Sequence, residues 1–161
     1  MGQKIKNTGF ESIINAVCII VLAGVFGYLI LNWNHLPNQI PAHYDANGTI
    51  DRWGNKNELW LCPIISLILF IIFTVIEKYL ITWEIKMNNG TVNSYRVSKQ
   101  ILMLVKMILI IAFSYITINS AGGHTLPNAF TVILLGAIFA VLVIGLIQYM
   151  YLKKKMNRRN M

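Results

Sequence analysis

Histidine and acidic residues that could bind a metal or another ligand gather in one polar segment of the sequence. Between residues 32 and 59 lie His35, His43, Asp45, Asp51 and Glu58, and the third histidine, His124, lies in a second, shorter polar segment. Neutral imidazole and carboxylate both bind zinc well. Their spacing fits no recognised zinc pattern, so we expect a histidine hydrogen-bonded to the segment's own backbone, with no metal and no cofactor.

The run from Asp45 to Asp51 also shares ligand types with a calcium-binding loop. Its glycine, Gly48, stands two positions too early, however, and no bidentate Glu follows at the twelfth position. Calcium is therefore disfavoured. We interpret Asp51 and Lys56 as a local ion pair or as a cap for the helix that follows.

The same segment has the features of an ordered loop. Pro37 and Pro41 fix the backbone angle φ on the way in, and Asn47-Gly48 is a dipeptide typical of tight turns, with Tyr44 and Ile50 on either side. Trp33, Tyr44, Trp53 and Trp60 are expected to form an aromatic belt at the lipid headgroups. We predict one binding unit, in which Pro37, Pro41 and Lys56 support His43, Gly48 and Asp51.

Catalytic chemistry has little support in this sequence. A nucleophile with an adjacent base, or an intramembrane zinc sequence of the His-Glu-x-x-His type, would be needed, and neither is present. We therefore expect a protein that is not an enzyme.

The rest of the chain consists largely of long apolar blocks. It has 161 residues, of which 56% are hydrophobic and 12% charged, which is about half the charge of a soluble fold. Four blocks are long enough to cross a bilayer as helices, at about residues 13–31, 60–81, 101–118 and 129–152. The predicted fold class is an all-α membrane protein with four transmembrane helices and a structured extracytoplasmic loop between the first two.

The positive charge of the chain, +8 in total, lies at the ends of these blocks and predicts their orientation. Five Lys and Arg residues follow the last block, whereas the segment between the third and fourth blocks has none. Positive flanks stay in the cytoplasm, so both termini should be cytoplasmic. This placement disfavours nucleic-acid binding and leaves the lipid bilayer as the expected partner.

Polar residues within the blocks are few. Asn15 lies near the start of the first block, and Lys106 lies close enough to the start of the third to snorkel to the interface. With apolar mid-span positions, transport is not expected. Cys18 and Cys62 lie too far apart in depth for a disulfide.

Small residues predict one contact between helices. Ala23 with Gly27, and Gly136 with Ala140, form small-xxx-small pairs in the first and fourth blocks. We expect these two helices to touch there. Incidental small residues in apolar runs are an equally good interpretation.

The loop residues carry a resemblance to a known family. Leu36-Pro37, Ile40-Pro41, His43, Gly48, Asp51 and Lys56 match the pattern LPxxIPxHxxxxGxxDxxxxK. This pattern resembles the N-terminal membrane domain of SdpI-type bacterial immunity proteins, which protect a toxin producer from its own peptide. Residues 82–161 lack the C-terminal Arg-Thr-Pro-Trp-like segment of that family.

The resemblance implies an SdpI-like domain over residues 1–81, followed by a second transmembrane hairpin with a basic tail over residues 82–161. It also implies a bacterial plasma-membrane protein that gives immunity to a membrane-active peptide, with a peptide toxin or another membrane protein as partner. The alternative is a regulator or accessory subunit whose basic cytoplasmic faces recruit a soluble partner.

Overall fold

Four long helices make up most of the described chain. The structure, a computed structural model, describes residues 8–86 and 92–157, with the backbone alone for residues 81–86, 92–94 and 156–157. The helices are α1 (Gly9–Asn32), α2 (Leu61–Lys86), α3 (Val92–Ala121) and α4 (Phe130–Asn157). Each holds a stretch long and apolar enough to cross a membrane. The predicted fold class is confirmed, and the chain is a multi-pass membrane-type protein.

The helices extend beyond the apolar blocks at several ends. At the start of α1, the Thr8 hydroxyl accepts a hydrogen bond from the Glu11 amide, and the Glu11 carboxylate accepts one from the Thr8 amide. This reciprocal cap satisfies two amides that have no partner in the helix. Helix α3 begins nine residues before the predicted start, because its polar first turns continue the same helix.

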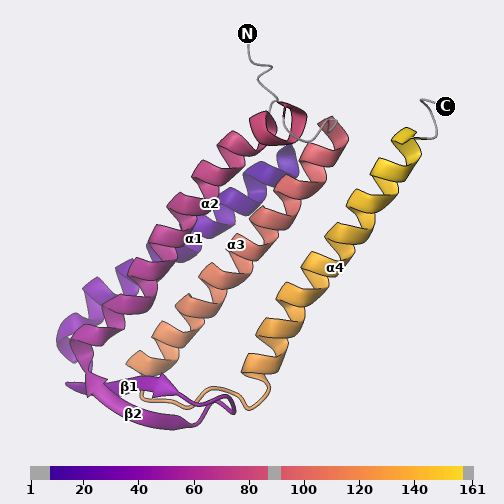
Figure 1. The fold of residues 1–161 in the computed structure, drawn as a ribbon. Coiled ribbons are helices and arrows are strands. Elements are labelled where there is room, and N and C mark those ends of the chain that lie inside the picture. The colour runs from indigo at the N-terminus through magenta and orange to yellow at the C-terminus, as the bar shows by residue number, and fades with distance from the viewer. Residues whose placement is uncertain (1–7, 87–91, 158–161) are drawn as a thin grey trace.

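The helices run side by side with both chain ends at the same end of the bundle (Figure 1). We call the end with Gly9 and Asn157 the termini end. The opposite end, with the loop between α1 and α2 and the connection 122–129, is the hairpin end. Helix α3 packs against each of the other three helices. Both termini thus lie at one end, and the prediction that this end is cytoplasmic stays a prediction.

The predicted contact between the first and fourth helices is wrong. Helix α4 packs on α3, and a side chain added at Gly27 or Gly136 would meet open space. The close approach lies instead at Gly145, where an added Cβ would collide with the side chain of Ile101. Glycine at this position lets α3 and α4 come together.

A small sheet closes the hairpin end. Strands β1 (Gln39–Tyr44) and β2 (Ile50–Asn55) pair antiparallel between two short 3₁₀ turns, η1 (Trp33–His35) and η2 (Lys56–Trp60). Buried Ile40 and Leu59 pack against Leu29 of α1 and Ala121 of α3, which fixes the hairpin on the bundle. The predicted loop is therefore an ordered, two-stranded structure.

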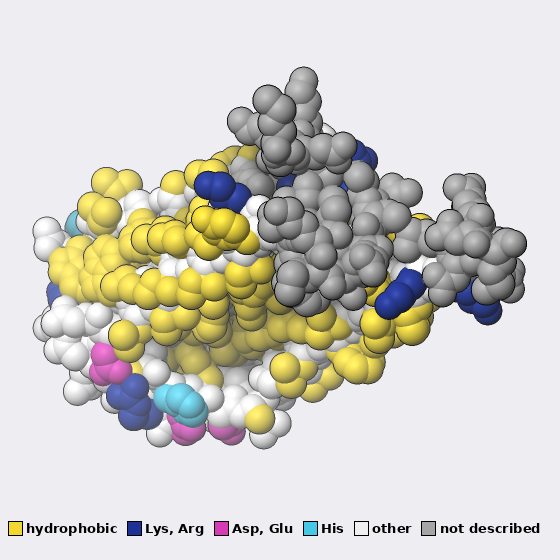
Figure 2. All heavy atoms as spheres, turned by 45° about the horizontal axis from the view of Figure 1, so that its top comes forward, with side chains coloured by type: hydrophobic (Ala, Val, Ile, Leu, Met, Phe, Trp, Pro, Cys, Tyr) yellow, Lys and Arg dark blue, Asp and Glu magenta, His cyan; other side chains and the backbone are white. Residues whose placement is uncertain are grey.

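Hydrophobic side chains cover much of the long face of the bundle (Figure 2), as expected for helices that face lipid. The interior near the termini end is built from Ile14, Cys18, Leu22, Met103 and Ile110. Cys18 and Cys62 are both free thiols, as predicted.

Candidate functional site

The hairpin brings two of the predicted binding residues together. The His43 Nδ1 atom lies 2.6 Å and 2.9 Å from the two carboxylate oxygens of Asp51. Their side chains are 63% and 46% exposed. The expectation that His43 bonds the backbone is wrong, since its partner is a side chain across the hairpin.

An irregular strand pairing accounts for this contact. The register shifts on both sides of His43, which pairs with Arg52. Asp51 lies at the second shift, between Arg52 and Ile50. Such bulges re-aim side chains that would otherwise alternate between faces. The irregularity therefore allows His43 and Asp51 to meet on one side of the hairpin.

The turn of the hairpin depends on Asp45 and Gly48. The Asp45 carboxylate accepts hydrogen bonds from the amides of Asn47 and Thr49, so it caps the turn rather than standing free as a ligand. Gly48 has a φ of 81°, which confirms the prediction of a positive angle. Its carbonyl accepts a hydrogen bond from the Leu126 amide at 2.9 Å, which ties the turn to the connection between α3 and α4.

Tyr44 forms a second tie between the same two segments. Its hydroxyl lies 3.0 Å from Ser120 Oγ and donates to the carbonyl of His124 at 3.0 Å. Burial raises the pKa of the Tyr44 phenol above its ordinary value. Tyr44 thus anchors the hairpin to the connection between α3 and α4, and its predicted place at the lipid headgroups stays a prediction.

Lys56 does not pair with Asp51, so that prediction is wrong. Its Nζ lies 5.2 Å from the centre of the Trp33 ring and 3.5 Å from the Trp33 carbonyl oxygen. The cap before α2 also comes from other residues, since Asn55 and Glu58 bond each other's backbone amides. Lys56 therefore faces the base of the hairpin, away from the His43 pair.

A second exposed pair lies on the same hairpin. Arg52 Nη2 donates to Glu58 Oε2 at 2.8 Å, and the hydrogen bond with this carboxylate raises the pKa of the Arg52 guanidinium. Trp53, which is 55% exposed, stands next to this pair in sequence. The surface thus offers carboxylates, a cation, an imidazole and an indole ring.

Among the supporting prolines, Pro41 is buried and Pro37 is exposed. Pro41 lines a hollow of about 70 Å³ beneath the hairpin, together with Tyr44, Glu58, Thr117 and Ser120. A space of this size can hold water between polar walls. Within the described residues, no three His, Cys, Asp or Glu side chains converge as a metal site would require.

The bundle interior holds a charged cluster that sequence reasoning missed. Lys106 is fully buried, and its Nζ donates to Glu77 Oε1 at 2.7 Å and to Asn15 Oδ1 at 2.8 Å. These three residues come from α3, α2 and α1. The snorkelling prediction for Lys106 is wrong, because its ammonium group faces a carboxylate inside the protein.

A second ion pair lies closer to the termini end than Lys106 and Glu77 do. Lys99 Nζ donates to Glu11 Oε2 at 2.8 Å, and both side chains are nearly buried. Glu11 and Asn15 lie four residues apart on α1, and Lys99 and Lys106 seven apart on α3, so each pair shares a helix face. This spacing in the sequence could have predicted that these side chains face the same part of the bundle.

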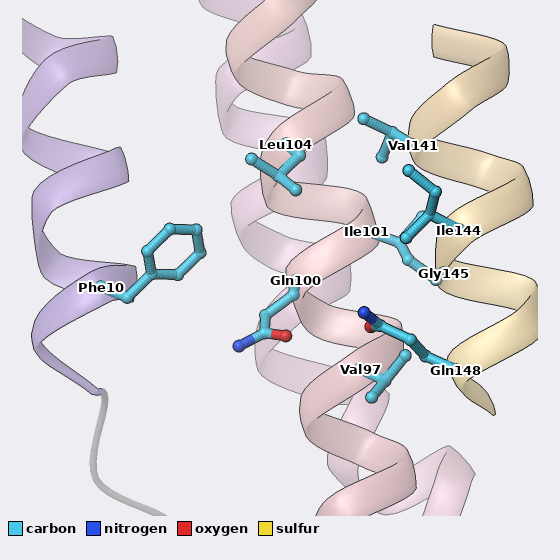
Figure 3. Close-up of a pocket in the computed structure, with 9 residues that line it drawn as sticks. All are labelled: Phe10, Val97, Gln100, Ile101, Leu104, Val141, Ile144, Gly145 and Gln148. Atoms are coloured by element: carbon cyan, nitrogen blue, oxygen red, sulfur yellow. The ribbon is translucent and has the colours of Figure 1, made fainter. Parts of the chain in front are cut away.

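A separate groove lies between α1, α3 and α4 near the termini end (Figure 3). Ile101, Leu104, Val141 and Ile144 give it apolar walls, and the amides of Gln100 and Gln148 lie toward one end. None of the predicted binding residues lines it.

Comparison with known proteins places the hairpin inside a described domain. Residues 19–67 match the model of a domain of unknown function, DUF1648. This part of the chain is similar to that domain. The match includes most of α1, the whole β hairpin and the start of α2, and so contains every predicted binding residue.

One relative extends over most of the chain. An uncharacterized protein of Archaeoglobus fulgidus is 28% identical over 160 residues, covering 87% of this chain and 87% of its own length. No solved structure matches the chain.

Proposed function

We propose that the hairpin end is a recognition surface on the outer side of the cell membrane, where it contacts a membrane-active peptide or another membrane protein. The observation that carries this proposal is the exposed His43–Asp51 pair on a hairpin fixed to the bundle. Binding groups held in place by packing lose little entropy when a partner binds.

The distribution of charge supports this orientation. Lys153, Lys154 and Lys155 are exposed at the termini end of α4. At the hairpin end, Arg52 pairs with Glu58 and Lys56 lies against Trp33. Lys and Arg near span ends are retained on the cytoplasmic side, and the hairpin end has only these two. Both termini are accordingly proposed to face the cytoplasm.

A cationic amphipathic peptide is the partner that this surface suits best. The carboxylates of Asp51 and Glu58 would attract its basic residues, and the exposed Trp53 ring would accept a cation or an apolar side chain. Protection against such a peptide, as in the SdpI-type proteins that the loop resembles, is the proposed role. Because one relative is archaeal, restriction to bacteria is not part of the proposal.

Gene deletion followed by complementation tests this role. Cells without the protein should become more sensitive to at least one membrane-active peptide, and the wild-type chain should restore resistance. A His43→Ala, Asp51→Ala double variant should fail to restore it. Asn57→Ala, which changes an exposed side chain of the same region, should restore it fully. Unchanged sensitivity of the deletion strain across a broad peptide panel would show that the protective role is wrong.

A regulatory role remains the second candidate, supported by the exposed lysines at the end of α4. Each basic residue near an anionic leaflet contributes about 1 kcal/mol, so the tail could hold a partner or lipid at the surface. Arg158 and Arg159, outside the described residues, are the positions to neutralise. Membrane topology should survive this change through the lysines, and recruitment of a cytoplasmic partner should be lost.

A further inference from the structure

The charged cluster of Glu11, Asn15, Glu77, Lys99 and Lys106 lies inside the bundle, toward the termini end of the apolar spans. Along α3, Lys106 lies about 17 Å from Tyr95 and about 23 Å from Ala121, the two ends of its apolar span. On the neighbouring helices the cluster lies nearer the termini end, since Asn15 is six residues after the start of the α1 span at Gly9 and Glu77 is three residues before the end of the α2 span at Leu80. Charges buried within such spans are costly and commonly mark pathways for ions or protons.

Helix packing alone is a weak explanation for these charges. Removing two ions from water costs about as much as their attraction returns, so apolar side chains of similar size would hold the helices equally well. The two acids and two lysines balance in charge. A neutral, hydrogen-bonded acid–base array can pass protons without changing its total charge.

The chemistry of the central pair allows such a transfer. When a proton moves along the 2.7 Å hydrogen bond, an N–H bond of Lys106 breaks and an O–H bond forms on Glu77. The products are a neutral amine and a neutral carboxylic acid, which a low-dielectric interior accommodates readily.

A separate set of buried hydroxyl groups lies between this pair and the hairpin end, beyond an apolar stretch of α3. Ser114, Thr117 and Ser120 recur along α3, and Ser66 adds a hydroxyl from α2. Among the described residues, the Oγ atoms of Ser66 and Ser114 have no hydrogen-bond partner. Hydroxyls both donate and accept hydrogen bonds, so they can relay a proton or hold a water molecule that does.

The charged cluster and the buried hydroxyl groups each reach a polar region at one end of the bundle. Toward the termini end, Glu11 and Lys99 follow the central pair. Toward the hairpin end, Thr117 and Ser120 line the hollow that Tyr44 and Glu58 share. Between Lys106 and Ser114 lies an apolar stretch that includes Ile110 and Leu22, about 12 Å along the helix. Passage across this stretch requires transient hydration.

We infer that the chain conducts protons through the bundle along α3, with Lys106 and Glu77 as the central transfer pair. This activity is separate from the proposed recognition role and does not depend on it. It needs no cofactor, because the transferred species is a proton that the two bulk phases supply and accept.

Proton flux into proteoliposomes tests this inference. The full chain is reconstituted in phospholipid vesicles, a potassium gradient with valinomycin makes the interior negative, and an enclosed dye reports the internal pH. Wild-type vesicles should acidify faster than protein-free vesicles. The driving force acts on either orientation of the protein, so random insertion does not affect the result.

Matched variants separate conduction from packing. Glu77→Gln with Lys106→Met leaves no unpaired charge and should lower the flux to that of protein-free vesicles. Asn57→Ala changes an exposed side chain outside the charged cluster and the buried hydroxyls, and should conduct like wild type. Ser114→Ala leaves the charged cluster intact and should also slow conduction, which covers the case of a double variant that fails to fold.

Three results would overturn the inference. Wild-type flux equal to that of protein-free vesicles would do so, as would wild-type flux in a folded Glu77→Gln, Lys106→Met variant or in Ser114→Ala. Each result would show that protons do not pass along α3 through this pair and these hydroxyls.

Discussion

The amide nitrogen of Leu126 lies 2.9 Å from the carbonyl oxygen of Gly48, and this hydrogen bond joins the hairpin turn to the connection between α3 and α4. A Cβ added to Gly48 would lie only 2.5 Å from the Leu126 carbonyl oxygen. The glycine is therefore required both for its positive φ and for the close approach of the two segments.

Gly48→Val should release the hairpin from the bundle. The positive φ alone costs a residue other than glycine about 1–3 kcal/mol, and the collision with Leu126 adds to it. Limited proteolysis should show faster cleavage within residues 36–58, while the four helices remain inserted. Thr49→Val, at an exposed neighbouring position, should leave the cleavage rate unchanged; equal cleavage of both variants would contradict this account.

His43→Ala should leave the hairpin folded. The pair with Asp51 is well exposed, and exposed ion pairs contribute about 0–1 kcal/mol. Thermal melting and protease resistance should therefore stay close to wild type, while the proposed recognition is lost. Marked loss of protease resistance would instead identify His43 as a structural residue.

We expect the hairpin to loosen at alkaline pH, because Tyr44 anchors it. Because burial raises the pKa of its phenol in the folded state above the ordinary value of 10.0, its contribution to stability is complete below that value. The contribution is lost as the pH rises through the higher, folded-state pKa. Protease sensitivity of the hairpin should rise there in the wild type, and Tyr44→Phe should remove that pH-dependent step.

Lys106→Met should be much more destabilising than the double change with Glu77→Gln. Removing one partner leaves a buried charge without compensation, at a cost of about 3–5 kcal/mol, whereas removal of both is nearly neutral. Unfolding by denaturant in detergent should give a lower free energy of unfolding for the single variant than for the double variant. Equal stability of the single and double variants would show that the pair is not coupled.

Gly145→Ala and Gly136→Ala should differ in effect. An added Cβ at Gly145 collides with Ile101, and overpacking of this kind costs about 1–3 kcal/mol. At Gly136 the Cβ meets nothing. Thermal melting should drop for the first variant alone, and a matching drop for Gly136→Ala would indicate that α4 is packed differently from the structure described here.

The sequence by itself determined the number of helices, the shared side of the termini and the ordered turn at Gly48. These features depend on local properties, namely the length of an apolar block and the backbone freedom of one residue. The helix ends were predicted less well, since polar residues such as Asn93 and Gln100 continue α3 without an apolar signal.

Only the tertiary structure decided the partners of the charged residues. Lys106 and Glu77 lie 29 residues apart, and Tyr44 and Ser120 lie 76 apart, so no local pattern relates them. A lysine near the end of an apolar block can snorkel to water or turn inward to a carboxylate. Which of these it does depends on the helices packed around it, and that packing placed Glu77 and Asn15 against Lys106.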